Sequence, residues 1–342
     1  MAKLLGSEYK KENILKYTPN LKQIAGVTEA KYETGKGSGM KFYNVKNGSG
    51  LEFTLLPDRC MDIASVSYKG INISFLAKNG VVSPEYCYPY STEFLKYFIG
   101  GMLTTSGLLN SGGNCEDTDG TYHPIHGRIG TIPADNPYSL EYWQDNDYVI
   151  EAGGAVRECS LFGHNLILKR VIKTKLGDNS IEIFDTVENN AQEDIEFMLL
   201  YHFNFGFPFL DEDLKLNFPQ NTITPRTQEA KKGIEASEII TKPIDGFLEH
   251  VFFRDVKDEN GIVTVSLENQ KLGIGVKLSY EKENLPVLVQ WKSMKSGDYA
   301  LGIEPSSSFI KGRKEERENK TLKVIRGNSE IKYRLKLSFY DL

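Results

Sequence analysis

Alternation of apolar and polar residues is the feature of this 342-residue sequence that most limits its fold. The pattern recurs from about Leu51 to the carboxyl end, and the clearest example is the segment Tyr333–Tyr340. A period of two is typical of a β-strand that buries one face. In this segment the buried face is predicted to carry Tyr333, Leu335, Leu337 and Phe339. Further strands are predicted at Ala155–Leu161, Leu166–Thr174, Ser180–Glu188, Glu196–Phe205, Gly261–Leu267, Gly273–Tyr280 and Pro286–Lys292.

Turn-forming groups such as Gly177–Asn179 and Glu259–Gly261 separate these strands at the spacing of β-hairpins. Helix signals are few: short amphipathic stretches at Ser7–Lys16 and Thr92–Phe98, each after a plausible capping residue. The rhythm of strand, helix and strand that marks a parallel sheet is missing. The sequence therefore predicts an all-β fold, a large antiparallel β-sandwich with a few short helices.

One domain over residues 1–342 is the simplest organisation, because no linker, composition break or internal repeat divides the chain. Residues 1–50 are predicted to form an N-terminal extension that packs on the sandwich or leads into it. The segment Gly100–Asn136 is rich in Gly, Ser, Thr, Asn and Pro, and it is predicted to be a long polar loop. Loops of this length in a compact domain are often functional.

Composition excludes several classes of protein. The hydrophobic fraction of 40% and the charged fraction of 25% are those of a folded globular chain. The net charge is −5, with Lys and Arg scattered, which argues against a nucleic-acid partner. The most charged stretch, Lys311–Lys323, mixes both signs and is predicted to be a solvated loop.

The amino terminus lacks the apolar core of a signal peptide, and no apolar run is long enough to span a bilayer. These features predict a cytoplasmic protein with no membrane partner. Four cysteines show no paired metal or redox spacing, and they are predicted to be reduced, mostly buried thiols. They are Cys60, Cys87, Cys115 and Cys159.

The segment Glu196–Pro208 holds the first candidate for chemistry. A period of two places its aromatic residues on one face and His202 and Asn204 together on the other, where neither needs to be buried. Histidine is the side chain best suited to proton transfer near neutral pH. The alternative is a histidine satisfied by a neighbour at a sheet edge.

The segment Gly297–Ser307 holds the second candidate. Ala300, Gly302 and Glu304 share a face, and a glycine within a strand often marks the close approach of a ligand. The two small residues are predicted to leave open space beside the carboxylate, and Pro305 is predicted to end the strand with Glu304 at its rim. The alternative is a solvated glutamate.

Other residues could line the same site. Trp291 offers an apolar plate for a sugar ring, with Lys292 beside it, although a tryptophan buried in the core is the alternative. His126 and Arg128 lie next to glycines in the polar segment and could donate to sugar hydroxyls. Arg59 is a further donor, or else an ion-pair partner for Asp58 or Asp62.

Four pieces of the chain carry a resemblance to a known family: Asp58–Ile63, Ile125–Arg128, Leu200–Gly206 and Ala300–Pro305. With them the chain resembles the aldose 1-epimerase (galactose mutarotase-like) superfamily, and within it the uncharacterised branch of aldose 1-epimerase-related proteins, over most of Leu51–Leu342. The last two pieces are similar to the family segments that hold the catalytic histidine and glutamate. The second is similar to the Leu-His-Gly segment that holds a substrate-binding histidine.

The resemblance implies interconversion of the α and β anomers of a sugar, with Glu304 as base, protonated His202 as acid, and no cofactor or metal. It also implies a small-molecule sugar as partner and a monomer or homodimer. The chain departs from the family at Gly127-Arg128, where mutarotases carry Gly-Gly, and it lacks their Gly-Arg-x-Ala-Asn-Arg stretch. Asp211 is the candidate for their sugar-binding aspartate. A non-catalytic carbohydrate-binding or sensing protein is an alternative, as is another isomerase, epimerase or lyase reaction.

Overall fold

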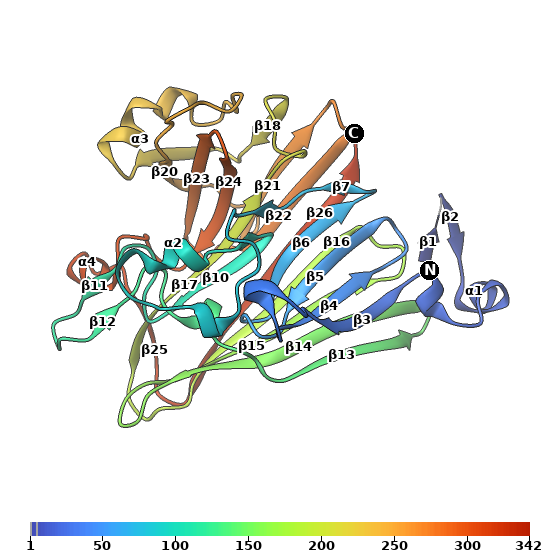
Figure 1. Cartoon of the computed structure of the whole chain (residues 1–342), viewed down its shortest axis with the longest axis horizontal. Helices are drawn as coiled ribbons and strands as arrows, with labels where there is room; N and C mark the ends of the chain where they lie inside the picture. The colour runs from blue at the N-terminus through green and yellow to red at the C-terminus, as the bar shows by residue number, and fades with distance from the viewer. Residues whose placement is uncertain (1, 5) are drawn as a thin grey trace.

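Two antiparallel sheets stacked face to face dominate the computed structural model, which describes residues 2–4 and 6–342 (Figure 1). Among the described residues, the larger sheet has twelve strands and the smaller has eight. The larger sheet runs in the order β19 (Asn221–Pro225), β20 (His250–Val256), β23 (Val287–Lys295), β24 (Asp298–Ser306), β17 (Ile195–Phe205), β10 (Leu103–Leu108), β6 (Asp62–Tyr68), β5 (Leu51–Leu56), β4 (Lys41–Lys46) and β3 (Gly26–Lys31), with β25 (Lys323–Ile325) on β17 and β7 (Ile71–Asn72) on β6.

The smaller sheet runs in the order β13 (Asp135–Gln144), β14 (Asp147–Cys159), β15 (Asn165–Lys175), β16 (Ser180–Asn189), β26 (Ser329–Asp341), β22 (Ile274–Glu281), β21 (Ile262–Asn269) and β18 (Leu214–Asn217). Three strand pairs lie outside these sheets: β1 (Ala2–Leu4) with β2 (Ser7–Tyr9), β8 (Phe75–Leu76) with β9 (Gly100–Gly101), and β11 (Cys115–Glu116) with β12 (Tyr122–His123). The helices are short: α1 (Lys11–Tyr17), α2 (Phe94–Tyr97), α3 (Gln228–Lys232) and α4 (Arg313–Glu318), with 3₁₀ turns at Leu21–Gln23, Gly35–Gly37, Pro84–Tyr86, Ser91–Glu93, Ile129–Thr131 and Ile234–Ala236.

The core lies between the two sheets, and it is built from the faces that the period of two predicts. The four alternating apolar residues of β26 are buried, and so are the five on the aromatic face of β17. They meet in one hydrophobic cluster that extends from Ala2 to Phe339. The predicted antiparallel sandwich is confirmed.

A buried ion network ties the two sheets together through Arg170 on β15. Its guanidinium donates to Asp62 Oδ1 (2.8 Å) on β6 and to Asp185 Oδ2 (2.7 Å) on β16. Asp62 also accepts from the backbone N–H and the hydroxyl of Thr105 on β10, and the Tyr201 hydroxyl donates to Asp185. Burial raises the pKa of Asp62 to about 6, against the opposing effect of Arg170.

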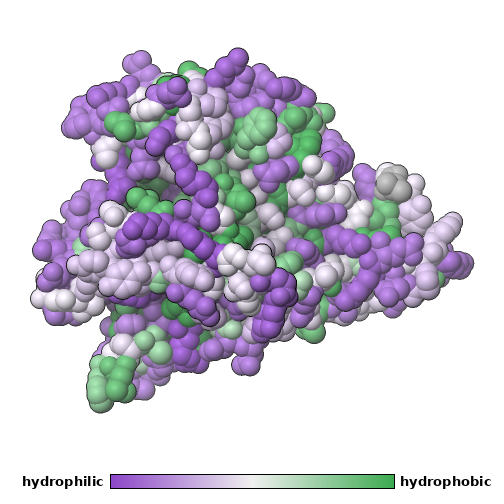
Figure 2. All heavy atoms as spheres, in the orientation of Figure 1, coloured by the Kyte–Doolittle hydropathy of each residue, from purple (hydrophilic) through white to green (hydrophobic). Residues whose placement is uncertain are grey.

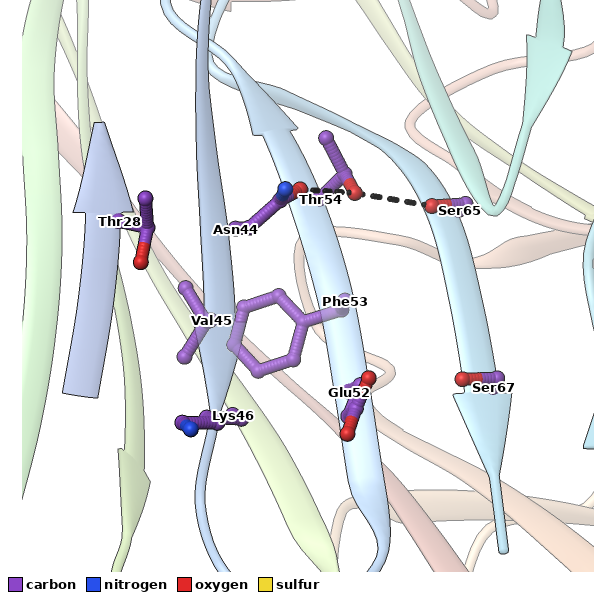
Figure 3. Close-up of a pocket in the computed structure, with 9 residues that line it drawn as sticks. All are labelled: Thr28, Asn44, Val45, Lys46, Glu52, Phe53, Thr54, Ser65 and Ser67. Carbon is purple, nitrogen blue, oxygen red and sulfur yellow. Dashed lines mark hydrogen bonds between the residues drawn. The ribbon is translucent and has the colours of Figure 1, made fainter. Parts of the chain in front are cut away.

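The outer face of the larger sheet carries polar side chains over β3 to β6 (Figure 3). There the Ser65 hydroxyl donates to Thr54 (3.0 Å), and the Thr54 hydroxyl donates to Asn44 (2.8 Å).

The first fifty residues contribute two strands, β3 and β4, to the larger sheet, and Val27 and Val45 reach the core between the sheets.

Three local predictions were wrong. Leu103–Leu108, predicted as loop, is the strand β10 in the middle of the larger sheet, and every residue in it is buried. A strand that is buried on both faces and rich in small residues shows no alternation, so it resembles a loop in sequence. Lys311–Lys323, predicted to be a solvated loop, includes the helix α4 and buries Arg313 and Glu316, although Lys314, Glu315 and Glu318 are exposed as predicted. Ser7–Lys16 divides into β2 and α1.

The predicted helix at Thr92–Phe98 is confirmed as α2, preceded by the 3₁₀ turn Ser91–Glu93. The cysteines are free thiols within the described chain, but only Cys60 is buried, so the expectation of mostly buried thiols was wrong. No helix of the described residues is long and apolar enough to cross a membrane.

Candidate active site

His202 and Glu304 occupy opposed positions on neighbouring strands. The register pairs Asn204 of β17 with Gly302 of β24, and Leu200 with Ser306, so His202 stands across from Glu304. The Nε2 atom of His202 lies 3.3 Å from Oε1 of Glu304. Both candidates are therefore in contact, from segments about a hundred residues apart.

Both side chains are buried, which corrects two predictions. His202 is 7% exposed and Glu304 is 1% exposed, although the sequence placed the first on an open face and the second at a rim. β24 continues through Pro305 to Ser306, so Glu304 is not the last residue of its strand. The Glu304 carboxylate bends back over Gly302, where an added Cβ would lie 2.2 Å from Oε1. The predicted open space above Gly302 is filled by this carboxylate.

Aromatic rings cover the pair. The ring centroid of Phe98, just after α2, lies 5.4 Å from that of His202, and the centroid of Trp291 on β23 lies 5.5 Å from it. Phe98 and Trp291 contact each other edge to face, and Phe75 on β8 contacts Trp291 in the same way. In Figure 2 the surface is hollowed between the segment with α3 and the segment with α2, the region to which β17, β23 and β24 lead.

His126 joins the cluster from the segment that follows β12. Its ring centroid is 5.7 Å from that of His202, and its Nδ1 atom is 2.9 Å from the Ser106 hydroxyl of β10. Its backbone is left-handed, with φ +58°, and Gly127 follows with φ +72°. An added Cβ at Gly127 would lie 2.1 Å from the Gly107 carbonyl, so glycine is required for the close approach of this turn to β10. The turn therefore holds His126 at the site.

A cation and an anion lie beside Trp291 at the edge of the sheet. Arg226 follows β19 directly, and its backbone N–H donates to the Val251 carbonyl on β20. Across the next two strands, Val251 pairs with Trp291, and Trp291 pairs with Gly302. Residues paired across strands share a face, so Arg226 lies on the same face as the site. The indole N–H of Trp291 donates to Glu249 (2.8 Å). The side chain of Arg226 is exposed and has no hydrogen-bond or ion-pair partner among the described residues.

Burial sets the protonation of the pair. It raises the pKa of Glu304 well above its usual range, helped by the charge of Glu249 and opposed by Arg226. It lowers the pKa of His202 to about 4. Both shifts favour the uncharged forms, a carboxyl that carries a proton and a neutral imidazole. Oε1 of Glu304 has no regular hydrogen-bond partner among the described residues.

Asn204 lies on the same strand face as His202, two residues further along β17. Its Nδ2 donates to the His202 carbonyl (2.8 Å) and to the Gly100 carbonyl (3.3 Å), which leaves Oδ1 as the free atom. This amide raises the pKa of His202, while Oδ1 of Asn204 and Nδ1 of His202 are both buried without a regular hydrogen bond to another described residue. In the tautomer with its proton on Nδ1, the Nε2 atom near Glu304 would be free to accept a proton.

Five of the nine predicted site residues lie in this cluster: His202, Glu304, His126, Asn204 and Trp291. The other four, Arg59, Arg128, Asp211 and Lys292, lie elsewhere. Arg59 is 2% exposed and donates to the Val82 and Tyr97 carbonyls, so it secures the segment before Phe98. Lys292 points away from Trp291 and donates to the carbonyls of Ala236 (2.7 Å) and Ile239 (2.5 Å).

Asp211 accepts from Asn269 and Lys271, and Arg128 lines a different cavity. Phe98, Arg226 and Glu249 were not predicted from the sequence. No local pattern marks them, because Phe98 reaches His202 from the segment after α2, while Arg226 and Glu249 lie just outside β19 and β20.

The structure resembles solved structures over nearly its whole length. A putative aldose 1-epimerase from Klebsiella pneumoniae is 25% identical with a TM-score of 0.87, covering 92% of this chain and 83% of that one. A galactose mutarotase-like protein from Clostridium acetobutylicum is 15% identical with a TM-score of 0.66, covering 94% and 100%. A galactose 1-epimerase from Lactobacillus acidophilus is 15% identical with a TM-score of 0.57, covering 93% and 99%.

The sandwich and these neighbours define a protein of the galactose mutarotase-like fold, so the resemblance read from the sequence is confirmed. Residues 37–339 match one family model, and the chain belongs to that family, the domain of unknown function DUF4432. No match to the sequence was found among curated proteins.

Proposed function

We propose that the protein interconverts the α and β anomers of an aldose or aldose derivative. The observation that carries the proposal is the buried contact of His202 Nε2 with Glu304 Oε1 at 3.3 Å. In their uncharged forms the carboxyl is an acid and the imidazole is a base, and the opening of a sugar ring requires one of each.

Each proton has a source and a destination in this scheme. One member of the pair takes the proton of the anomeric hydroxyl while the other gives a proton to the ring oxygen, and the bond between the anomeric carbon and the ring oxygen breaks. The aldehyde rotates about its bond to the next carbon. Closure reverses both transfers and leaves the pair as it began.

The direction of the first transfer depends on where the shared proton lies. The resting pair, with its proton on Glu304, would use the carboxyl as acid and Nε2 of His202 as base. Transfer of the proton across the 3.3 Å contact gives the arrangement implied by the family resemblance, with a carboxylate base and an imidazolium acid. The reaction needs one proton in the pair and is served by either arrangement.

Surrounding residues supply recognition. Trp291 and Phe98 offer apolar surfaces against which a pyranose ring can pack, and they exclude water from the pair. His126, next to His202, and Arg226, on the same face of the sheet, would donate N–H groups to sugar hydroxyls. A sugar would enter by displacing these rings from His202.

Nuclear magnetic resonance of a panel of aldoses tests the proposal, with the protein added to each sugar in D₂O. The proposal predicts faster exchange between anomer signals for at least one sugar, with no deuterium at any carbon. Deuterium at carbon would instead indicate epimerisation or isomerisation at another centre, and line broadening without exchange would indicate a binding protein.

A further inference from the structure

A cavity lies beside the segment that carries His126, and it is lined by residues other than the His202–Glu304 pair. It has a volume of about 760 Å³, and the residues around it include Arg128, His123, Glu158, His164, Ser160 and Arg313. Arg128 follows His126 by two residues, and its backbone N–H donates to the Gly107 carbonyl, while the backbone N–H of Gly107 donates to His126. The same turn therefore faces the candidate active site with one residue and this cavity with another.

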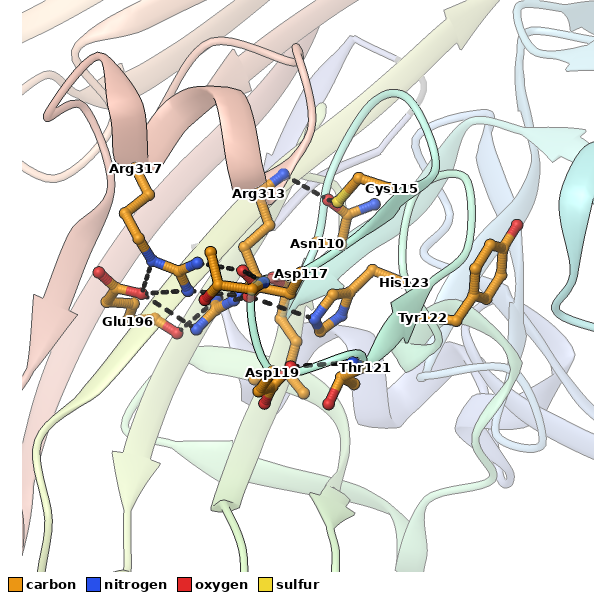
Figure 4. Close-up of polar contacts among 12 residues, drawn as sticks. Asn110, Cys115, Asp117, Asp119, Thr121, Tyr122, His123, Glu196, Arg313 and Arg317 are labelled. Atoms are coloured by element: carbon orange, nitrogen blue, oxygen red, sulfur yellow. Dashed lines mark hydrogen bonds and ion pairs between the residues drawn. The ribbon is translucent and has the colours of Figure 1, made fainter.

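On one wall of the cavity, two arginines form ion pairs with two carboxylates (Figure 4). Arg313 donates to Asp117 (3.0 Å) and to Glu196 (3.3 Å), and Arg317 pairs with the same two carboxylates. The Arg317 guanidinium holds the pKa of Asp117 well below its usual range. Two cations and two anions balance at this wall. The other charged residues around the cavity are Arg128, Arg157, Asp119 and Glu158.

Arg128 brings a positive charge to the cavity and makes few contacts within the protein. Within the described part of the chain its guanidinium donates one hydrogen bond, to the Tyr122 carbonyl (3.0 Å), although the group has five N–H donors. Its charge, together with that of Arg313, acts on His123, His164 and Glu158. All three of these side chains line the same cavity.

His123 provides a second observation. It is 3% exposed and lines the cavity, yet its Nδ1 atom has no hydrogen-bond partner among the described residues. Its other nitrogen, Nε2, lies 3.7 Å from Asp117. A buried polar atom without a partner costs free energy unless a ligand or water satisfies it.

We infer that this cavity binds a small polar organic anion through Arg128 and His123, at a site separate from the His202–Glu304 pair. The volume exceeds what an inorganic ion fills. The lining offers guanidinium and imidazole groups for the charged end of the ligand, and hydroxyl and carboxyl groups that can bind the hydroxyls of a polyol, as suits a polyol with a phosphate or carboxylate group. The ring of Phe162 is fully exposed and no other lining residue is Phe, Tyr or Trp, so a flat base would find no buried ring on which to stack.

Isothermal titration of the full chain with inorganic phosphate and with glucose 6-phosphate tests the inference, with glucose as the uncharged control. Saturable binding of the sugar phosphate is expected, and Arg128→Gln should weaken it at least about tenfold, since the variant loses a charged hydrogen-bond donor to the anion. Arg226→Gln should leave it unchanged. Absence of saturable binding for both probes, or an affinity equal in Arg128→Gln and the wild type, would overturn the inference.

A second variant keeps the test decisive if Arg128→Gln does not fold. The Glu158 side chain accepts from the backbone N–H of Leu108 (2.8 Å), and glutamine can keep that bond. At pH 8 the Glu158 carboxyl, whose pKa burial raises to about 7, is mostly ionised and opposes an anion. Glu158→Gln should therefore bind glucose 6-phosphate several-fold more tightly at that pH. Unchanged or weaker binding in this variant, or loss of binding in Arg226→Gln, would place the anion elsewhere.

Discussion

His202 Nε2 and Glu304 Oε1 lie 3.3 Å apart because β17 and β24 pair in a register that opposes the two residues. The contact is fixed by backbone hydrogen bonds and not by a mobile loop, so its geometry is set by the sheet. The loop residue His126 and the ring of Phe98 then complete the site from the segments that cover this face.

Trp291 should report the binding of a sugar. The chain has two tryptophans, and Trp143 packs on Tyr148 in the smaller sheet, with ring centroids 5.2 Å apart. In Trp143→Phe we expect the tryptophan fluorescence to change on addition of a bound aldose, because the ring must move off His202. In Trp291→Phe the same sugar should leave the fluorescence unchanged. An equal response in both variants would show that sugar binding does not involve Trp291.

Arg226 should contribute to substrate binding more than to the chemical step. Replacing it by glutamine removes a charged donor at the edge of the site, so KM for the exchanged sugar should rise about tenfold with little change in kcat. Lys231→Gln on α3 is the matched control, since Lys231 is an exposed cation on a neighbouring segment. Equal effects of the two changes would mean that Arg226 acts only through net charge.

Glu304→Gln should stabilise the fold at neutral and alkaline pH. The folded protein holds a proton on Glu304 above pH 4.5, where the unfolded chain loses it, so wild-type stability falls as pH rises from about 4.5 toward the raised pKa of the folded state. The variant lacks this loss, and its Tm should exceed that of the wild type by about 2 °C or more at pH 8. The difference should shrink toward pH 4.5. Thermal unfolding at several pH values measures it, and a constant difference would contradict the assignment.

Arg170→Met should destabilise the fold strongly, since it leaves Asp62 and Asp185 buried without their cation. Loss of one partner from a buried ion pair costs roughly 3–5 kcal/mol. Arg334→Met is the control, because Arg334 is exposed on β26 and its loss should cost less than about 0.5 kcal/mol.

Urea unfolding measures both variants. The deficit of Arg170→Met should be smaller at pH 5 than at pH 8, since Asp62 has a pKa of about 6 even beside Arg170 and can take up a proton. A loss under about 1 kcal/mol at pH 8 would mean that the network adds little stability.

Much of the fold could be predicted from local pattern. A period of two identified β26 and β17 because each buries one complete face, and it placed His202 and Asn204 together because residues two apart in a strand share a side. The same reasoning failed for β10, whose buried Gly, Ser and Thr residues carry no alternation.

The site was predicted in part for a related reason. Which residues share a strand face is a local property, but what covers that face is not. Phe98 and Trp291 bury His202 from segments about a hundred residues away on either side, so the predicted open face is closed. Arg59 and Arg128 were wrongly predicted to line the site. A guanidinium on a long side chain can take several directions, and the backbone carbonyls that it binds come from other segments of the chain.

The rate of anomer exchange in paired variants tests the central claim most directly. Exchange nuclear magnetic resonance would be measured for a responsive aldose with the wild type, Glu304→Gln and His202→Asn, and with the controls Glu316→Gln and His250→Asn, which change a buried carboxyl and an imidazole outside the site. We predict that each site variant lowers the exchange rate at least about tenfold while remaining folded, and that the controls match the wild type. Exchange at the wild-type rate in both site variants would contradict the account.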